Sequence, residues 1–374
     1  MLEYLKVSNY KAFGAEPSLM KLRPLTVVIG KNNSGKSSLL KLVSILSTMS
    51  ECKSTAPILL KNDSVSLGGR YQDLFHNNVT SSLRIGLGFD DMAFEATYLM
   101  NQGEIFVGIS DDKLLGWESP AVFSQENPFF VLNEHMIHSG DSHLSGKFSS
   151  FYIGPLRPGI RRNIQPGGEN DSRLLPDGRN VCEVLLASYN SADKKLFNSV
   201  ASWLADNLDC TGLNFERNSE TSGSFSLATR HGSANVNLAD VGQGIGQVLP
   251  VVVSSFMESH AEITIIEQPV LHLHPAAHSA VAARLADSAL EMKRNYLIET
   301  HSHNFILALR EMVADKKNPL KAEDVVIYSV EQDDDESWLK EITLDEEGNL
   351  SDWPEGVFAE SYQLLKNIRS HQSR

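Results

Sequence analysis

The stretch Val27–Ser38, VVIGKNNSGKSS, has the residue types and spacing of a phosphate-binding loop. Gly30, Gly35, Lys36 and Ser37 satisfy the pattern G-x-x-x-x-G-K-[ST]. Backbone N–H groups have to wrap a phosphate in such a loop, and glycines leave room for that approach. Lys36 is predicted to reach phosphate oxygens, Ser37 to ligate Mg²⁺, and the helix starting near Lys36 to add its positive end. The other predicted nucleotide-contacting residues are Asn32, Asn33, Ser34 and Ser38. An ordinary glycine turn is the alternative.

A phosphate-binding loop of this kind works with a second carboxylate that holds Mg²⁺ from the end of a buried strand. The segment ITIIEQP predicts such a strand at Ile263–Ile266, followed by Glu267 as the candidate Mg²⁺ partner. Gln268 comes next, where a general base would be expected. Its amide cannot accept a proton at neutral pH, but it can orient a water molecule. The alternative for Glu267 is a carboxylate that only ends a strand.

A second glycine-rich stretch, ADVGQGIGQ at Ala239–Gln247, lies just before an apolar segment typical of a helix. Gly242, Gly244 and Gly246 leave backbone N–H groups exposed at the N-terminus of that helix, which is a second place for an anion. A flexible linker would have a similar composition. The sequence therefore predicts two phosphate-binding devices in one chain.

Three histidines are further candidates for a site. His301 comes after a strand at Tyr296–Ile298 and can donate a hydrogen bond to a γ-phosphate. A histidine that only satisfies the end of a strand is the alternative. His272 and His274 are spaced i, i+2, so they could hold a metal on one face of a strand, although no further matched ligands accompany them.

The elements that would position these residues follow from hydrophobic periodicity. Strands are expected at Leu2–Phe13 and Leu25–Ile29, and the helix after the loop should bury one face. The residues of that face are Leu39, Leu42, Val43 and Leu46. No heptad run follows, so we expect no coiled coil.

The remaining segments predict an α/β protein with a mixed sheet, an antiparallel β lobe and a helical lobe. The expected segments are antiparallel strands in Ser82–Val107, a strand at the start of Phe151–Asn163, helices at Asn180–Tyr189 and Ala192–Leu208, a hairpin of Leu213–Arg217 with Ser224–Arg230, helices at Val248–Met257, Pro275–Met292 and Asn304–Val313, and a hairpin of Val325–Val330 with Trp338–Leu344. The acidic run Asp333–Asp335 is typical of a solvated turn.

Composition limits the classes of function. The chain has 374 residues, of which 41% are hydrophobic and 21% charged, as in a globular protein with a substantial core. No apolar run has the length of a membrane span, the start lacks a signal peptide, and the three cysteines show no metal spacing, so we expect a cytoplasmic protein. The net charge of −14 argues against nucleic-acid binding by the whole surface. Arg157, Arg161 and Arg162 are the candidates for a local basic patch.

The ordered set of motifs resembles the ABC-class ATPase heads of the OLD (overcoming-lysogenization-defect) and SMC-like group. The opening NYKAF is similar to the NFKSF-type strand of these AAA-type ATPases. A bacterial subgroup with a C-terminal WPEGFF-type box is the nearest resemblance, and the box here is Trp353–Phe358. GPLR at Gly154–Arg157 and LGGRYQDLFH at Leu67–His76 also look like that subgroup.

The resemblance implies one ABC-type P-loop head over residues 1–374, with an inserted β and helical lobe at 52–236 and a hairpin with the WPEG box at 320–374. It places Walker A at Gly30–Ser38, Walker B at Glu267 and the switch histidine at His301. Gln72 is the candidate Q-loop and metal-site residue. Such heads form head-to-tail homodimers, or higher homo-oligomers, in which the signature of one subunit closes over the ATP of the other. Gly242 and Gly244 would be that signature.

Departures from the resemblance leave several functions open. Similar heads commonly have a carboxylate at Gln268, although Gln is common there in the WPEGFF-type subgroup, and an engineered Glu→Gln change would look the same. The subgroup also often has an acidic residue at Val270. One reading is a slow Mg²⁺-dependent ATPase that controls a separate effector, such as a nuclease or toxin, in anti-phage defence. A second is an ATP-locked scaffold that hardly turns over. A third is an SMC-like repair ATPase that binds DNA.

Overall fold

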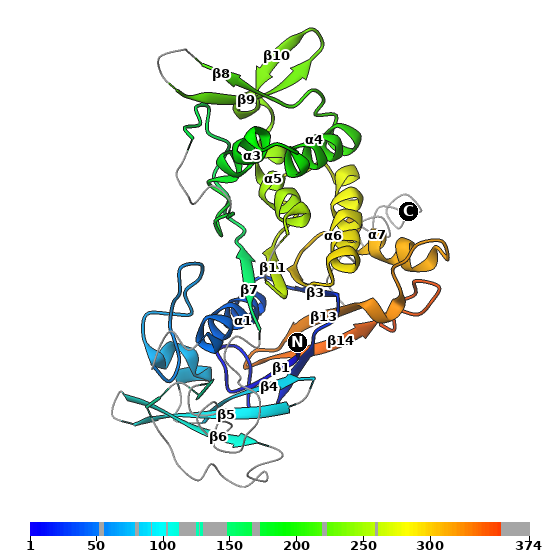
Figure 1. Ribbon diagram of the computed structural model, residues 1–374. Coiled ribbons are helices and arrows are strands. Elements are labelled where there is room, and N and C mark those ends of the chain that lie inside the picture. Colours follow the sequence, from blue (N-terminus) through cyan, green and yellow to red (C-terminus); the bar gives the residue numbers. More distant parts are fainter. Residues whose placement is uncertain are drawn as a thin grey trace, which may run out of the picture. The chain divides into compact units, whose positions relative to one another are not determined.

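The computed structural model describes residues 1–51, 56–78, 82–90, 92–101, 104–111, 125–126, 128–129, 148–166, 173–218, 223–258 and 261–352. The chain divides into two compact units (Figure 1). The first comprises Met1–Phe148 and Arg310–Arg374, and the second is the continuous segment Ser149–Leu309. Each unit is described by itself below.

An antiparallel sheet forms much of the first unit, with the strand order β2-β1-β4-β5-β6. Its strands are β1 (Leu2–Ser8), β2 (Ser18–Lys21), β4 (Leu83–Phe89), β5 (Met92–Asn101) and β6 (Glu104–Asp111). Alternating residues build the core, because Leu5 of β1 lies opposite Met20 of β2 and Leu87 of β4, and all three are buried. The structure confirms the expected antiparallel lobe.

The nucleotide-loop strand β3 (Leu25–Gly30) belongs to a second layer of the first unit. It pairs in parallel with β13 (Val325–Gln332), which pairs antiparallel with β14 (Ser337–Thr343). Every residue of β3 is buried, as is typical of a strand covered on both faces. The predicted C-terminal hairpin is therefore confirmed, and its tip is the exposed turn that begins at Asp333.

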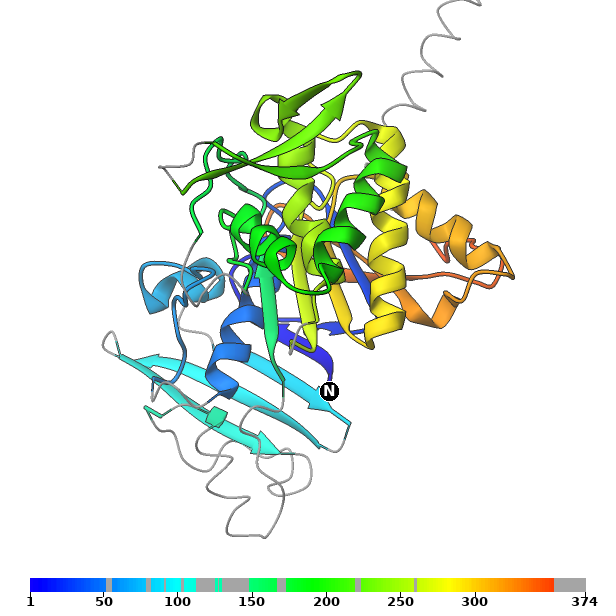
Figure 2. The same ribbon diagram turned by 45° about the horizontal axis from the view of Figure 1, so that its top comes forward.

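Helix α1 (Lys36–Ser50) follows the loop and lies beside the antiparallel sheet in both views (Figures 1 and 2). The prediction of a single buried face was too narrow, because eleven of its fifteen residues are buried. Phe148 provides one reason. Its ring packs on Phe89 with centroids 5.8 Å apart, and its carbonyl accepts a hydrogen bond from Ser50 at 3.0 Å.

Three parallel strands organise the second unit in the order β12-β11-β7. They are β7 (Ser150–Ile153), β11 (Ile263–Glu267) and β12 (Asn295–Glu299), with Glu267 opposite Glu299 and Ile266 opposite Ile153. Parallel strands require crossover connections, which the helices of this unit supply. Those helices are α3 (Val181–Asn190), α4 (Lys195–Leu208), α5 (Gln243–Phe256), α6 (His278–Met292) and α7 (His303–Ala314), the last of which ends in the first unit.

A small antiparallel sheet lies at the end of the helices α3, α4 and α5 (Figures 1 and 2). It contains β8 (Asn214–Arg217), β9 (Phe225–His231) and β10 (Ala234–Asn237). Phe215 of β8 packs against Tyr189 and Phe197, with ring centroids 5.4 and 5.8 Å away, which attaches the sheet to α3 and α4. The hairpin of β8 and β9 was predicted, whereas β10 was not.

Helix length and side-chain clusters add further facts. The longest helices of the described segments, α1 and α6, have fifteen residues each, and none of the described helices has the length and apolar character needed to cross a bilayer. Cys182 and Cys210 are free and buried. Among the residues whose positions are given, His, Cys, Asp and Glu side chains form no group of three that could hold a metal ion.

Candidate nucleotide-binding site

The segment between β3 and α1 has the backbone of a phosphate-binding loop. Gly30, Asn33 and Gly35 all have positive φ angles, of 145°, 66° and 96°. A Cβ atom on Gly30 would lie 2.6 Å from the carbonyl oxygen of Val330, and one on Gly35 would lie 3.0 Å from the Phe13 ring. Both glycines are therefore required by conformation and by space. The predicted strand, loop and helix are all present.

Lys36 is the first residue of α1, and its side chain lies under the loop. It is 4% exposed, and its Nζ donates a hydrogen bond to the carbonyl of Lys31 at 2.5 Å. Ser34 is buried and donates to the same carbonyl at 2.9 Å. These contacts hold the Lys36 ammonium group near the N-terminus of α1, where the positive end of the helix dipole also favours an anion.

The polar residues around Lys36 differ in exposure. Asn32 and Asn33 are exposed, whereas Ser37 and Ser38 are half-buried in the first turn of α1. A hydroxyl at the position of Ser37 is a ligand type that Mg²⁺ accepts together with phosphate oxygens. The loop residues present therefore fit a Mg²⁺-nucleotide, whose metal would supply charge neutralisation at the terminal phosphate.

The turn at Tyr10–Phe13, which follows β1, contacts this loop and the start of α1. The phenol of Tyr10 is fully buried and donates a hydrogen bond to the carbonyl of Ser38 at 3.1 Å. Burial raises the pKa of Tyr10 well above its usual range, so the phenol remains a donor. Tyr10 and Phe13, both in the NYKAF segment, therefore support the loop. This supporting role was not predicted from the sequence.

Gln72 lies on the short helix η1 (Tyr71–Leu74) of the first unit, and it is exposed. This helix is attached to the same N-terminal turn, because the backbone N–H of Lys11 donates to the carbonyl of Leu74 at 2.8 Å. Just after η1, the N–H of His76 donates to the carbonyl of Asn9 at 3.0 Å. The role of Gln72 at the metal remains a prediction.

Glu267 is the last residue of β11, in the second unit, and it is 4% exposed. The hydroxyl of Tyr152 on β7 donates a hydrogen bond to its Oε1 atom at 2.5 Å. Burial, followed by the charge of Glu267, raises the pKa of Tyr152 far above the usual value for a phenol. The strand-end position of Glu267 was predicted, but its orienting partner was not.

Gln268 begins the turn that follows β11. Its φ angle is 50°, in the left-handed region, and its side chain is half-buried. Its N–H donates to the carbonyl of Glu299 at 2.8 Å, while its own carbonyl accepts from Arg157 at 2.5 Å. The backbone of the predicted water-positioning residue is therefore fixed on both sides.

Arg157 is a structural residue rather than part of a DNA-binding patch, so this prediction was wrong. Its side chain is buried and donates to the carbonyls of Gly154, Gln247, Glu267 and Gln268 at 3.0, 2.6, 2.9 and 2.5 Å. Burial lowers its pKa to about 10, and the charge of Glu267 partly opposes that effect.

The two neighbouring arginines are exposed but engaged in ion pairs. Arg161 lies 3.6 Å from a carboxylate oxygen of Glu183, and Arg162 makes a fork to Asp240 with distances of 2.9 and 2.5 Å. These pairs reduce the positive charge available for a phosphate backbone. The local basic patch is correspondingly weak.

The signature glycines were predicted to form a loop before a helix. The structure instead places them at the N-cap and in the first turn of helix α5. The helix begins at Gln243 with Gly242 as its N-cap, so Gly244 and Gly246 lie inside it. A Cβ atom on Gly244 would lie 2.8 Å from the carbonyl oxygen of His272, whereas one on Gly242 would have nothing within 4 Å in the described structure. Gly244 therefore permits close packing within this unit, and Gly242 faces open space.

His301 lies between β12 and α7, so its predicted position after a strand is confirmed, and it is exposed. The next residue, Ser302, accepts a hydrogen bond from the N–H of Phe305 at 3.0 Å and so caps α7. Ser302 also lies 2.7 Å from Nδ1 of His278, whose Nε2 is 3.2 Å from the carbonyl of Leu273. His278 was not identified from the sequence.

His272 and His274 lie in the turn between β11 and η5 (Pro275–Ala277), not on a strand. Both are exposed, and Nδ1 of His274 accepts a hydrogen bond from the N–H of Ala276 at 3.3 Å. The alternative of a metal held on a strand face is therefore wrong.

The predicted site residues fall into two sets. The loop from Gly30 to Ser38 and Gln72 belong to the first unit. The second unit holds Glu267, Gln268, His301, Gly242 and Gly244, and Arg157 links two parts of this set. The box at Trp353–Phe358 lies outside the described residues.

Comparisons with known proteins agree with this architecture. Residues 1–140 match the family described as "AAA ATPase domain", and residues 320–368 match "Protein of unknown function (DUF3696)". A search of curated protein sequences gave no match.

Two solved structures have a similar fold. The first is an SMC head bound to the C-winged helix domain of ScpA, with a TM-score of 0.54 and 11% identity, covering 92% of this chain and 98% of that chain. The second is an SMC head domain with an extended coiled coil bound to the C-terminal domain of ScpA, from Pyrococcus furiosus. Its TM-score is 0.51 at 11% identity, with 98% and 99% of the two chains covered. The fold is that of an SMC-type ABC ATPase head, and the matches together support an ATPase.

Proposed function

We propose that this chain is a cytoplasmic, Mg²⁺-dependent ATP-binding head that hydrolyses ATP slowly. The observation that carries the proposal is the loop between β3 and α1, with glycines in the left-handed region at both ends and a buried lysine at the helix start. In this proposal Lys36 binds phosphate, Ser37 and Glu267 support the metal, Gln268 orients water, and His301 contacts the γ-phosphate.

Head-to-tail dimerisation around ATP is the second part of the proposal. Gly242 supports it, because the glycine N-cap of α5 faces open space in the described structure and precedes the free N–H groups of a helix start. In a two-fold dimer, this turn of each copy would close on the nucleotide held by the other copy, which gives two composite sites.

The proposed role is control of a separate effector protein, such as a nuclease or a toxin, in anti-phage defence. Support comes from the resemblance to OLD-type heads and the WPEG box, together with the printed descriptions of SMC heads bound to ScpA domains. The closure of the dimer around ATP would be the signal that the effector reads.

An ATP-locked scaffold with little turnover is the second candidate. It is favoured by the amide of Gln268, where similar heads commonly have a carboxylate, and by the buried Val270, where the WPEGFF-type subgroup often has an acidic residue. Without a carboxylate base, hydrolysis would be slow and ATP would act mainly to hold the dimer together.

Nucleotide binding is tested by titrating ATP and Mg²⁺ into the full chain by calorimetry, with Lys36→Ala as the test variant. Lys316→Ala is the matched control, since Lys316 is exposed and lies outside the loop. We expect Lys36→Ala to weaken binding by about 100-fold and Lys316→Ala to change it little. Retained micromolar affinity in Lys36→Ala would overturn the assignment.

Dimerisation and turnover are then separated by two measurements on the same proteins. Sedimentation velocity with and without ATP should show dimers only in the presence of nucleotide, and only where Lys36 is intact. Phosphate release distinguishes the two candidates, because an ATPase turns over and a scaffold forms the same dimer without measurable release.

A further inference from the structure

Arg157 joins two segments that the proposed function requires to act together. Its Nη1 atom donates to the carbonyl of Gln247, in the second turn of α5. Its Nη2 atom donates to the carbonyls of both Glu267 and Gln268, at the end of β11. One guanidinium therefore connects the glycine-initiated helix to the backbone of Glu267 and Gln268, the two residues proposed to support the metal and to orient water.

The connection to α5 is reciprocal. The side-chain amide of Gln247 donates a hydrogen bond to the carbonyl of Arg157, while the backbone carbonyl of Gln247 accepts one from its guanidinium. The Nε atom of Arg157 also donates to the carbonyl of Gly154, which ties the side chain to the end of β7. A planar fork with five donors can serve these diverging carbonyls at once, whereas a lysine ammonium acts as a point donor.

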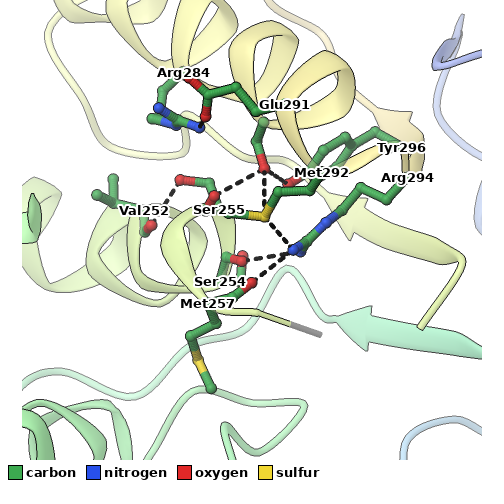
Figure 3. Close-up of polar contacts among 10 residues, drawn as sticks. Val252, Ser254, Ser255, Met257, Arg284, Glu291, Met292, Arg294 and Tyr296 are labelled. Atoms are coloured by element: carbon green, nitrogen blue, oxygen red, sulfur yellow. Dashed lines mark hydrogen bonds and ion pairs between the residues drawn. The ribbon is translucent and has the colours of Figure 1, made fainter. Parts of the chain in front are cut away.

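Helix α5 is also held at its other end, by hydrogen bonds to its last carbonyls (Figure 3). Arg294 donates to the carbonyls of Ser254 and Met257 at 3.2 and 2.6 Å, and Ser288 donates to that of Ser255 at 2.8 Å. These bonds satisfy carbonyls that a helix end leaves free. Arg157 near the glycine end and Arg294 at the other end therefore hold α5 on either side of Pro250, which lacks an N–H donor within the helix.

We propose that Arg157 is a positioning residue that couples engagement of the glycine end of α5 to the placement of Gln268. This inference rests on the proposed function, in which a second copy engages that glycine end when ATP is bound. Gln268 is the sensitive point, because its backbone is in the left-handed region and three hydrogen bonds hold it. Its N–H donates to the Glu299 carbonyl, and its carbonyl accepts from Arg157 and from the N–H of Leu271. Loss of these hydrogen bonds removes the link through Arg157 between α5 and the turn after β11, and leaves packing contacts such as that of Gly244 against the His272 carbonyl.

Hydrogen exchange of the full chain, with and without Mg²⁺ and ATP, tests the coupling without relying on turnover. In the unaltered protein we expect ATP to slow exchange in two peptides, one covering the P-loop and one covering Gln268–Leu273. In Arg157→Lys the P-loop peptide should still respond, whereas the response of the Gln268–Leu273 peptide should fall by about 10-fold. Arg161→Lys is the matched control, because it changes an exposed arginine of the same segment, and it should behave as the unaltered protein.

Gln247→Met guards against misfolding of a variant with a changed buried arginine. Gln247 is half-buried, and methionine keeps its length while removing the donor to Arg157. We expect a smaller but still selective loss of response in the Gln268–Leu273 peptide, because the backbone carbonyl of Gln247 still accepts from Arg157. Equal responses in both variants and the unaltered protein would overturn the inference alone. No ATP response in the P-loop peptide of the unaltered protein would instead overturn the proposed function.

Discussion

The hydroxyl of Tyr152 lies 2.5 Å from Oε1 of Glu267, and both side chains are almost completely buried. Tyr152 is on β7, and Glu267 is the last residue of the neighbouring parallel strand β11. The pairing of these two strands brings the phenol and the carboxylate together at the carboxyl end of β11. The hydrogen bond from Tyr152 fixes the position of Oε1 and thereby the orientation of the whole Glu267 carboxylate. The orientation of a metal-binding carboxylate is commonly set by such a partner.

Replacement of Tyr152 by phenylalanine should therefore impair metal use as well as stability. The loss of a hydrogen bond to a charged group should lower the free energy of unfolding by about 1.5–3 kcal/mol, measured by urea denaturation. The Mg²⁺ concentration for half-maximal phosphate release, or for ATP-dependent dimerisation, should rise by about 10-fold. Tyr296→Phe is the control, since Tyr296 is fully buried on β12 and its hydroxyl meets Ser288 at 2.8 Å. It should lose stability only, and an equal Mg²⁺ effect in both variants would contradict the prediction.

Gln268→Glu introduces a carboxylate where similar heads have a base. A group that accepts a proton should speed phosphate release, by about 100-fold if the carboxylate reaches the attacking water, and should loosen the ATP-bound dimer. Single-turnover hydrolysis and sedimentation velocity measure the two effects. Gln332→Glu adds the same charge at an exposed position at the end of β13 and serves as control. No change in release or dimer lifetime in Gln268→Glu would remove Gln268 from its proposed role.

His278 should make stability depend on pH. Burial lowers its pKa, which the hydrogen bond to the Leu273 carbonyl partly opposes and the nearby His274 reinforces. The unfolded chain then takes up a proton at higher pH than the folded one, so stability is lost as the pH falls below about 6.5 and levels off below the folded pKa. The slope for one proton is at most about 1.4 kcal/mol per pH unit.

The contribution of His278 is isolated by comparing urea unfolding of the unaltered protein and His278→Gln from pH 5 to 8. Glutamine keeps a donor for the Leu273 carbonyl and does not titrate, so the slope below pH 6.5 should be smaller in this variant. His231→Gln removes an exposed histidine and should leave the slope unchanged. An unchanged slope in His278→Gln would show that protonation of His278 is not linked to unfolding.

Gly30→Ala tests the conformation of the loop. Alanine is strained at a φ of 145°, and its Cβ would lie 2.6 Å from the carbonyl oxygen of Val330. The free energy of unfolding should fall by about 1–3 kcal/mol, and ATP binding should be lost with the loop geometry. Gly159→Ala is the matched control, because a Cβ there would have nothing within 4 Å. A stable Gly30→Ala protein with full ATP affinity would contradict this account of the loop.

Local sequence patterns predicted the loop, the strand ending at Glu267 and most helices, because each depends on neighbouring residues. Arg157 and Tyr152 were missed as site residues for the opposite reason. Arg157 donates to main-chain carbonyls 90 to 111 residues away, and a carbonyl is the same in every residue type. Tyr152 meets Glu267 only through a strand pairing between residues 115 positions apart.

The start of α5 shows a different limit. Three glycines in five residues favour a loop on propensity, yet the helix begins at Gln243. A tertiary contact explains why a glycine is found inside this helix, because Gly244 packs closely against the His272 carbonyl. Similarly, four periodic residues predicted one buried face of α1, whereas its wider burial includes contacts from Phe148, which is distant in sequence.

The pairing of β3 with β13 has a consequence for synthesis on the ribosome. Gly30 is seated against Val330, which is translated 300 residues later, so the nascent chain carries its P-loop sequence without the strand that supports it. At about 5–20 residues per second, this interval lasts roughly 15–60 s. The continuous segment Ser149–Leu309 has all its own strands and helices before then. A nascent chain that ends before β13 should accordingly be unable to retain nucleotide, so ATP binding should begin only after β13 has been translated.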